Sequence, residues 1–154
     1  MTAAEKLRLL LAEDDRFDAE AYNFIYEALD WTLQHVVTSE DRNNQHVTGQ
    51  ELLEGVRQYA IDQFGCLAGT VLKSWGITAT CSVGDMVFNL VSYDLMGKQE
   101  NDSPADFRDL YDFDEVFDLS PVFAYEPEQE EWSTSYVARS CCAAAGAAGA
   151  AKAK

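Results

Sequence analysis

One long amphipathic pattern follows Asp15 and constrains the fold more than any other feature of the sequence. Apolar or small residues recur there at intervals of three and four positions, the spacing of one face of an α-helix. The pattern predicts a helix over residues 16–37 with a wide apolar face that other parts of the chain must cover. The residues of this face are Phe17, Ala21, Phe24, Ile25, Ala28, Leu29, Thr32, Leu33 and Val36.

Weaker patterns of the same kind predict further helices over residues 49–64, 66–75 and 83–96, each followed by a glycine suited to a helix C-terminus. The intervening residues 77–80, with the sequence ITAT, are rich in β-branched side chains and predict a short strand or an extended connector. Five sites pair a Ser, Thr or Asp with an acid three positions later, which is typical of helix N-terminal caps. These pairs are Thr2 with Glu5, Asp15 with Asp18, Thr48 with Glu51, Ser82 with Asp85, and Ser103 with Asp106.

The last third of the chain has a different composition. Residues 100–131 contain 12 acidic residues and a single basic one, Arg108. From Phe107 to Phe117 the apolar and acidic residues interleave, so we expect this stretch to dock its aromatic side chains on the core. We predict a helical domain over residues 1–119, an acidic and aromatic strap or strand over 120–140, and a low-complexity disordered tail over 141–154.

These patterns predict a mainly α fold: a single-domain helical bundle with at most a short two-stranded element. The alternative is an α+β, winged-helix-like unit in which residues 98–107 follow three helices and form the wing. The would-be recognition helix over residues 83–96 contains Asp85 and Asp94 and has no Lys or Arg before Lys98. Proteins that read DNA grooves need cations for phosphates, so this alternative favours contact with protein.

The charge balance disfavours two classes of partner. The 154 residues carry 27 acids against 11 Lys and Arg, a formal net charge of −16. A nucleic acid or an anionic membrane surface would repel the average face of such a protein. The apolar run over residues 7–12 is too short to span a membrane and no cleavage motif follows it, so we expect a cytoplasmic protein without membrane contact.

The sequence offers little material for catalysis or metal binding. It has no P-loop, dinucleotide-binding glycine pattern, nucleophile elbow or H-E-x-x-H motif. Cys66 and Cys81 are predicted as small core residues, and neither pairs with a histidine at the spacing of a zinc site. Cys141 and Cys142 lie beside the tail and receive no role. We therefore expect no cofactor and no metal, and a catalytic use of Cys66 or His46 is the minority hypothesis.

Five longer strings of the sequence carry a resemblance to a known family. They are DDRFDAEAYNFIYEALDWT, HVTGQELLEGVRQYAIDQFG, VLKSWGI, GDMVFNLV and FRDLYDFDEVF. These strings resemble a conserved family of hypothetical proteins found largely in planctomycetes and verrucomicrobia. The resemblance covers about residues 3–119 and implies a cytoplasmic protein of similar size. It implies no activity, cofactor or catalytic residue, so no residue role is carried over.

The leading functional hypothesis is a noncatalytic interaction module that contacts a basic surface of a partner protein. Aromatic side chains supply anchors in protein interfaces, and neighbouring carboxylates steer a cationic partner. Two alternatives stay open: an enzyme of unrecognised class, and a homodimer formed through the helix over residues 16–37. The candidate contact residues of the leading hypothesis are Asp109, Tyr111, Asp112, Phe113, Asp114, Tyr125 and Trp132.

Overall fold

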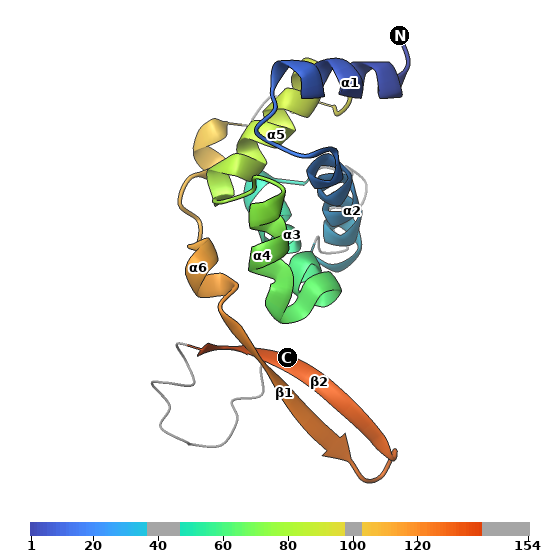
Figure 1. The fold of residues 1–154 in the computed structure, drawn as a ribbon, viewed down its shortest axis with the longest axis vertical. Helices are drawn as coiled ribbons and strands as arrows, with labels where there is room; N and C mark the ends of the chain where they lie inside the picture. Colours follow the sequence, from blue (N-terminus) through green and yellow to red (C-terminus); the bar gives the residue numbers. More distant parts are fainter. Residues whose placement is uncertain (37–46, 98–102, 140–154) are drawn as a thin grey trace.

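The computed structural model describes residues 1–36, 47–97 and 103–139. As predicted, these residues are mainly helical and contain one short antiparallel two-stranded sheet (Figure 1). The helices form a body, and the sheet is a hairpin that projects from one end of it (Figure 1). In chain order the elements are α1 (Ala3–Glu13), α2 (Ala19–His35), α3 (Gly49–Phe64), the 3-10 turn η2 (Gly65–Leu67), α4 (Ala68–Ser74), α5 (Thr80–Ser92), the 3-10 turn η3 (Pro104–Phe107), α6 (Phe113–Val116), β1 (Leu119–Glu126) and β2 (Glu131–Ala138).

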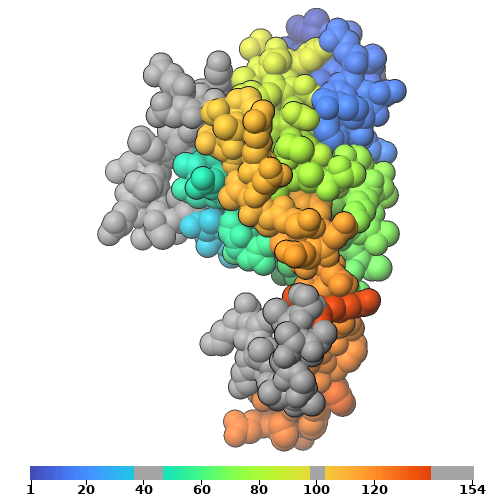
Figure 2. Space-filling model, turned by 90° about the vertical axis from the view of Figure 1, so that its left-hand side faces the viewer, coloured from blue at the N-terminus to red at the C-terminus, as the bar shows by residue number. Residues whose placement is uncertain are grey.

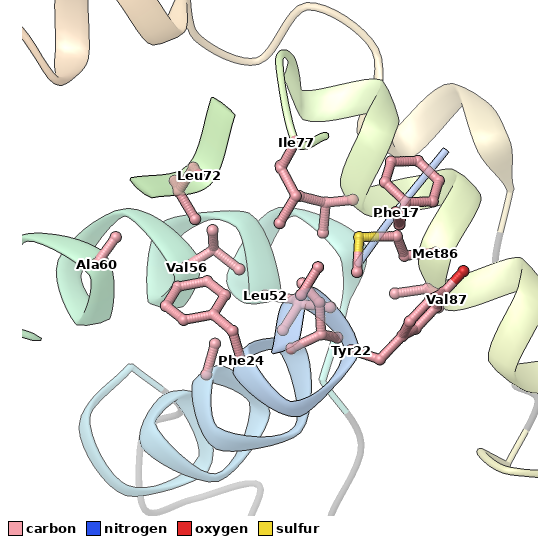
Figure 3. Packing of buried hydrophobic residues seen from close by; sticks show 14 of the residues in the cluster. Phe17, Tyr22, Phe24, Leu52, Val56, Ala60, Leu72, Ile77, Met86 and Val87 are labelled. Carbon is pink, nitrogen blue, oxygen red and sulfur yellow. The ribbon is translucent and has the colours of Figure 1, made fainter. Parts of the chain in front are cut away.

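The core lies where α2 and α3 pack together and receive side chains from α4 and α5 (Figure 3). The predicted apolar face of α2 supplies Ala21, Ile25 and Ala28, which are fully buried. Gly55 of α3 lies directly against Thr32 of α2, so the two helix backbones approach closely. The Thr32 hydroxyl donates a hydrogen bond of 2.6 Å to the carbonyl oxygen of Ala28, which satisfies this buried polar group within its own helix.

Three of the five predicted caps are confirmed. Thr2 and Ser103 form reciprocal capping boxes with the acid three positions later, and the Thr48 hydroxyl accepts the backbone N–H of Glu51. The other two are wrong, because α2 begins one turn later than predicted and α5 begins earlier. Asp18 itself caps α2, and α5 starts at Thr80 without a side-chain cap.

One further expectation is corrected, and one is decided between its alternatives. Cys66 and Cys81 are exposed rather than buried, because η2 and the first turn of α5 direct them away from the core. Of the two alternatives for residues 77–80, the connector is confirmed and the strand is wrong, since residues 77–79 lead without strand pairing into α5 at Thr80. Ile77 of this connector is buried in the core, so its β-branched side chain serves packing rather than sheet pairing.

A polar cluster ties the α1–α2 connection to α5. The guanidinium group of Arg16 donates to Asp14 at 2.7 Å and to Asp85 at 3.2 Å. Asn89 donates to the other side of the cluster, reaching both Asp14 and the hydroxyl of Tyr22. The Arg16 hydrogen bonds hold the pKa of Asp14 well below its usual range, against the opposing effect of desolvation. The carboxylate is therefore a structural group in the folded protein.

The stretch from Phe107 to Phe117, called the acidic segment below, packs on the helical body through its aromatic residues, as its interleaved pattern predicts. Phe107 ends η3 and packs against Gly49 and Gly84, where the absence of a side chain makes room for its ring. Phe113 and Phe117 are buried and contact each other edge to face, with 5.1 Å between ring centroids. The segment thus joins the core and leads the chain to the hairpin.

The winged-helix alternative does not hold for the described residues. The expected wing lay over residues 98–107, of which 98–102 fall outside the described residues and 104–107 form a 3-10 turn. The hairpin instead follows α6 and lies at the far end of the body from α5 (Figure 1). Residues 141–154, the predicted tail, also fall outside the described residues.

Candidate interaction surface

The hairpin presents two chemically different faces. Its register pairs Leu119 with Ala138 and continues without a bulge to the pair of Glu126 and Glu131. Side chains alternate between the faces of a strand, so every second pair shares a side. The aromatic face, as we define it, carries Leu119, Pro121, Phe123 and Tyr125 from β1 with Trp132, Thr134, Tyr136 and Ala138 from β2.

The outer half of the aromatic face is exposed. Phe123 is 66% exposed, Tyr125 47% and Trp132 72%. Tyr125 and Trp132 are cross-strand partners whose ring centroids lie 5.2 Å apart. Single exposed apolar residues are common, but three large aromatics on one side of a short hairpin form a contiguous patch typical of interaction sites.

The tip of the hairpin is strongly acidic. It carries Glu126, Glu128, Glu130 and Glu131, and no Lys or Arg lies between Leu119 and Ala138. Glu126 and Glu131 face each other directly across the ladder. Like charges in this arrangement destabilise a hairpin, so the tip is not optimised for stability. A cationic partner would remove that repulsion.

The base of the hairpin meets the helical body through Tyr136. Its ring lies against Gly65, which has a positive φ of 56° and whose missing side chain leaves the space that the ring occupies. Leu119 is buried at the same end, whereas the tip lies clear of the body (Figures 1 and 2). The hairpin is therefore an arm anchored at one end.

A groove of about 1000 Å³ runs between this arm and the helices. The strand side is formed mainly by β2, and the opposite wall by α2, α3 and α6. Asp62 and Glu115 contribute carboxylates to this wall, while Arg57 is held by hydrogen bonds to Glu54, which lower the pKa of that carboxyl group. The lining residues are Trp31, Arg57, Gln58, Ile61, Asp62, Glu115, Val116, Leu119, Thr134, Ser135, Tyr136 and Ala138.

The predicted contact residues separate into two groups. Tyr125 and Trp132 lie on the arm, about 20 Å along β1 from its buried end at the usual rise per residue of a strand. The other five precede β1, within the segment that wraps the body. This group consists of Asp109, Tyr111, Asp112, Phe113 and Asp114.

Four of the five residues on the body already make contacts within the chain. The Tyr111 hydroxyl donates to the carbonyl oxygen of Leu53 at 2.7 Å, and burial raises its pKa; Phe113 is buried beside it. Asp112 caps α6, and Asp114 forms an ion pair with Lys73. Only Asp109 is exposed without a hydrogen bond or ion pair to another described residue.

Phe123 and the groove residues were missed in the sequence. Phe123 could have been found, because in a strand it lies on the same side as Tyr125, two positions further along the chain. The groove could not, since its wall combines α2, α3, α6 and β2, which are distant in sequence.

The residues of the enzyme hypothesis are not assembled into a site. Cys66 borders a shallow hollow with Lys73 and Asp114, which pair with each other, and no histidine lines this hollow among the described residues. His46 falls outside the described residues. His35 stacks on Trp31 with 3.8 Å between ring centroids. Across the described ranges, no three potential metal-ligating side chains come together.

Two further findings concern membrane-spanning helices and similarity to known proteins. Within residues 1–36, 47–97 and 103–139, no helix combines the length and apolar character needed to cross a bilayer. No protein-family model, curated protein or solved structure matches the chain. The resemblance described above therefore stays a prediction, and the surface of this chain is the guide to its function.

Proposed function

We propose that the protein is a noncatalytic interaction module that uses its hairpin to contact a basic surface of a partner protein. The observation that carries the proposal is the exposed aromatic triplet of Phe123, Tyr125 and Trp132 beside a tip with four glutamates. Rigid aromatic side chains that lose their hydration on binding are the usual anchors of protein interfaces.

The electrostatics favour a cationic partner. The formal charge of −16 and the acidic tip attract positively charged surfaces over a distance set by the salt concentration. Such attraction raises the association rate and selects the partner, whereas the aromatic residues supply the affinity. Lysine and arginine stems can also cover aromatic rings while their charged ends meet the glutamates.

The hairpin is a better candidate than the acidic segment on the body. Tyr111 and Phe113 pack on the core and cannot anchor a partner without leaving it. The homodimer alternative is less favoured for a related reason: Tyr22 of α2 is buried in the core, and the hydroxyl of Tyr26 donates to the carbonyl oxygen of Leu95. The apolar face of α2 is thus largely occupied within the chain.

The test is affinity capture from native lysate with the full chain and two pairs of variants. Trp132→Ser and the triple change Glu128→Gln, Glu130→Gln, Glu131→Gln should each lose the captured partner. Leu110→Ser and Asp109→Asn, which alter an exposed apolar residue and an exposed acid on the body, should keep it. Raising salt from about 0.05 to 0.5 M, which shortens the screening length severalfold, should weaken capture.

The outcomes separate the two surfaces. Loss of the partner with the body variants alone would move the contact to the acidic segment. If neither higher salt nor the hairpin variants reduce the amount of partner captured, the proposal is refuted.

A further inference from the structure

The outer edge of β2 has free backbone hydrogen-bonding groups. Arg139 donates its backbone N–H to the carbonyl oxygen of Asp118 at 2.9 Å, which marks this pair as one that bonds across the ladder. Bonded and non-bonded pairs alternate, so Trp132, Thr134 and Tyr136 direct their N–H and C=O groups away from β1. Among the described residues, no backbone hydrogen bond outside the hairpin uses these groups.

The corresponding edge of β1 is blunted. Pro121 occupies an outward-facing position, as expected for a residue without an N–H, and interrupts the row of donors that an added strand would need. β2 contains no proline and has no such interruption. Of the two edges of the sheet, β2 is therefore the one suited to accept another strand.

The β2 edge also borders the groove. Thr134 and Tyr136 line it on the strand side, and Ile61 and Asp62 of α3 are among the residues opposite. A volume of about 1000 Å³ lies at the upper end of the range for ligand pockets, so the groove has room for several residues of extended chain. A segment bound there could bond to β2 on one side and contact α3 on the other.

The charges around the groove select the chemistry of that segment. Asp62 and Glu115 lie on its wall, Glu131 begins β2, and Arg57 is already engaged by Glu54. A second copy of this chain would bring another set of tip glutamates to an acidic edge, which like-charge repulsion disfavours. A segment rich in lysine or arginine meets complementary charge at Asp62 and Glu115 on the wall and at Glu131 at the start of β2.

We propose that the groove binds an extended, cationic segment of the partner protein, which adds to the free edge of β2 as a third strand. Such strand addition draws affinity from main-chain hydrogen bonds and specificity from alternate side chains. The inference rests on the proposed function and names the form in which the partner is recognised.

The test uses a synthetic peptide of the same length as β2 that alternates lysine with valine and threonine. It is titrated into the full chain while the backbone amides are followed by NMR. Binding should slow hydrogen exchange at Thr134 and Tyr136, whose N–H groups would become donors to the peptide. Two further forms of the peptide are N-methylated at every second residue, one at the odd positions and the other at the even positions. The form that lacks the N–H groups facing β2 should bind about tenfold or more weakly, and the other form should keep its affinity.

A change in the protein provides a matched control. Thr134→Pro removes one outward N–H without touching the ladder bonds to β1, whereas Thr134→Val keeps that N–H. The proline variant should bind the peptide about tenfold more weakly than the valine variant, with the β1–β2 cross-strand contacts intact in both NMR spectra.

The results distinguish this inference from the proposed function. Equal tolerance of both methylated frames, or equal binding by the two Thr134 variants, would overturn strand addition even where Trp132→Ser still abolishes capture of the partner. No binding of the unmethylated peptide would also overturn it. Capture that is indifferent to every hairpin variant would instead overturn the proposed function.

Discussion

The contact between α2 and α3 gives a quantitative prediction for Gly55→Ala. A Cβ atom at this position would lie 1.7 Å from Oγ1 and 2.8 Å from Cβ of Thr32. Non-bonded carbon atoms normally approach to about 3.5–4.0 Å, so one of the helices or the Thr32 side chain must move. Rotation of Thr32 would break its hydrogen bond to Ala28 in a fully buried site.

The expected change in the free energy of unfolding is the sum of two destabilising terms and one stabilising term. Overpacking a well-filled core costs about 1–3 kcal/mol, and loss of a buried hydrogen bond adds about 1 kcal/mol. Alanine is the better helix former and returns about 1 kcal/mol. We therefore expect Gly55→Ala to lower the free energy of unfolding by about 1–3 kcal/mol. For a chain of this length this corresponds to a decrease in Tm of about 2–12 °C.

Thermal and urea unfolding followed by far-UV circular dichroism measures this change. Gly97→Ala is the control, since no atom lies within 4 Å of its added Cβ and its stability should change by less than about 0.5 kcal/mol. Thr32→Ala should cost less in the Gly55→Ala background than in the parent, because the clash is partly relieved. A Gly55→Ala protein as stable as the parent would refute the close approach of the two helices.

Two further predictions concern acid stability and thiol chemistry. The carboxylate of Asp14 contributes stability that is complete above its unfolded pKa of about 4 and is lost as pH falls toward the lower folded pKa. Asp14→Asn should therefore make the free energy of unfolding depend less on pH between about pH 4 and 2. Asp15→Asn is the exposed control, and identical acid profiles for the two variants would contradict the role of the Arg16 hydrogen bonds. Cys66 and Cys81 are exposed and should both react with a thiol reagent in the native protein, at rates within about tenfold of a free cysteine when mapped by peptide mass. A far faster rate at Cys66 alone would favour the enzyme hypothesis over the noncatalytic one.

Periodicity and capping predicted most of the helical body. The apolar face of α2 and the Thr48 cap of α3 are local features that tertiary packing reinforces. The start of α5 could not be found in this way, because Ala79 precedes it and offers no side-chain cap. The exposure of Cys66 and Cys81 was also beyond the sequence, since a small residue fits either side of a helix.

The predicted contact residues lie in two different surroundings. Tyr125 and Trp132 lie on the exposed aromatic face, but Tyr111 and Phe113 pack on the core. Interleaved acids and aromatics look alike in both places, because a surface segment and a docked segment both have one acidic side. Only the three-dimensional path of the chain separates them.

Because the hairpin is anchored at one end only, substitutions in the hairpin and substitutions in the helical body have different consequences. Beyond Leu119, none of its apolar residues is buried in the helical core. Substitutions near the tip are therefore expected to cost little folding stability, whereas substitutions in α2 or α3 are constrained by packing. With the hairpin as the proposed contact surface, the choice of partner can change on the arm while the helical body stays the same.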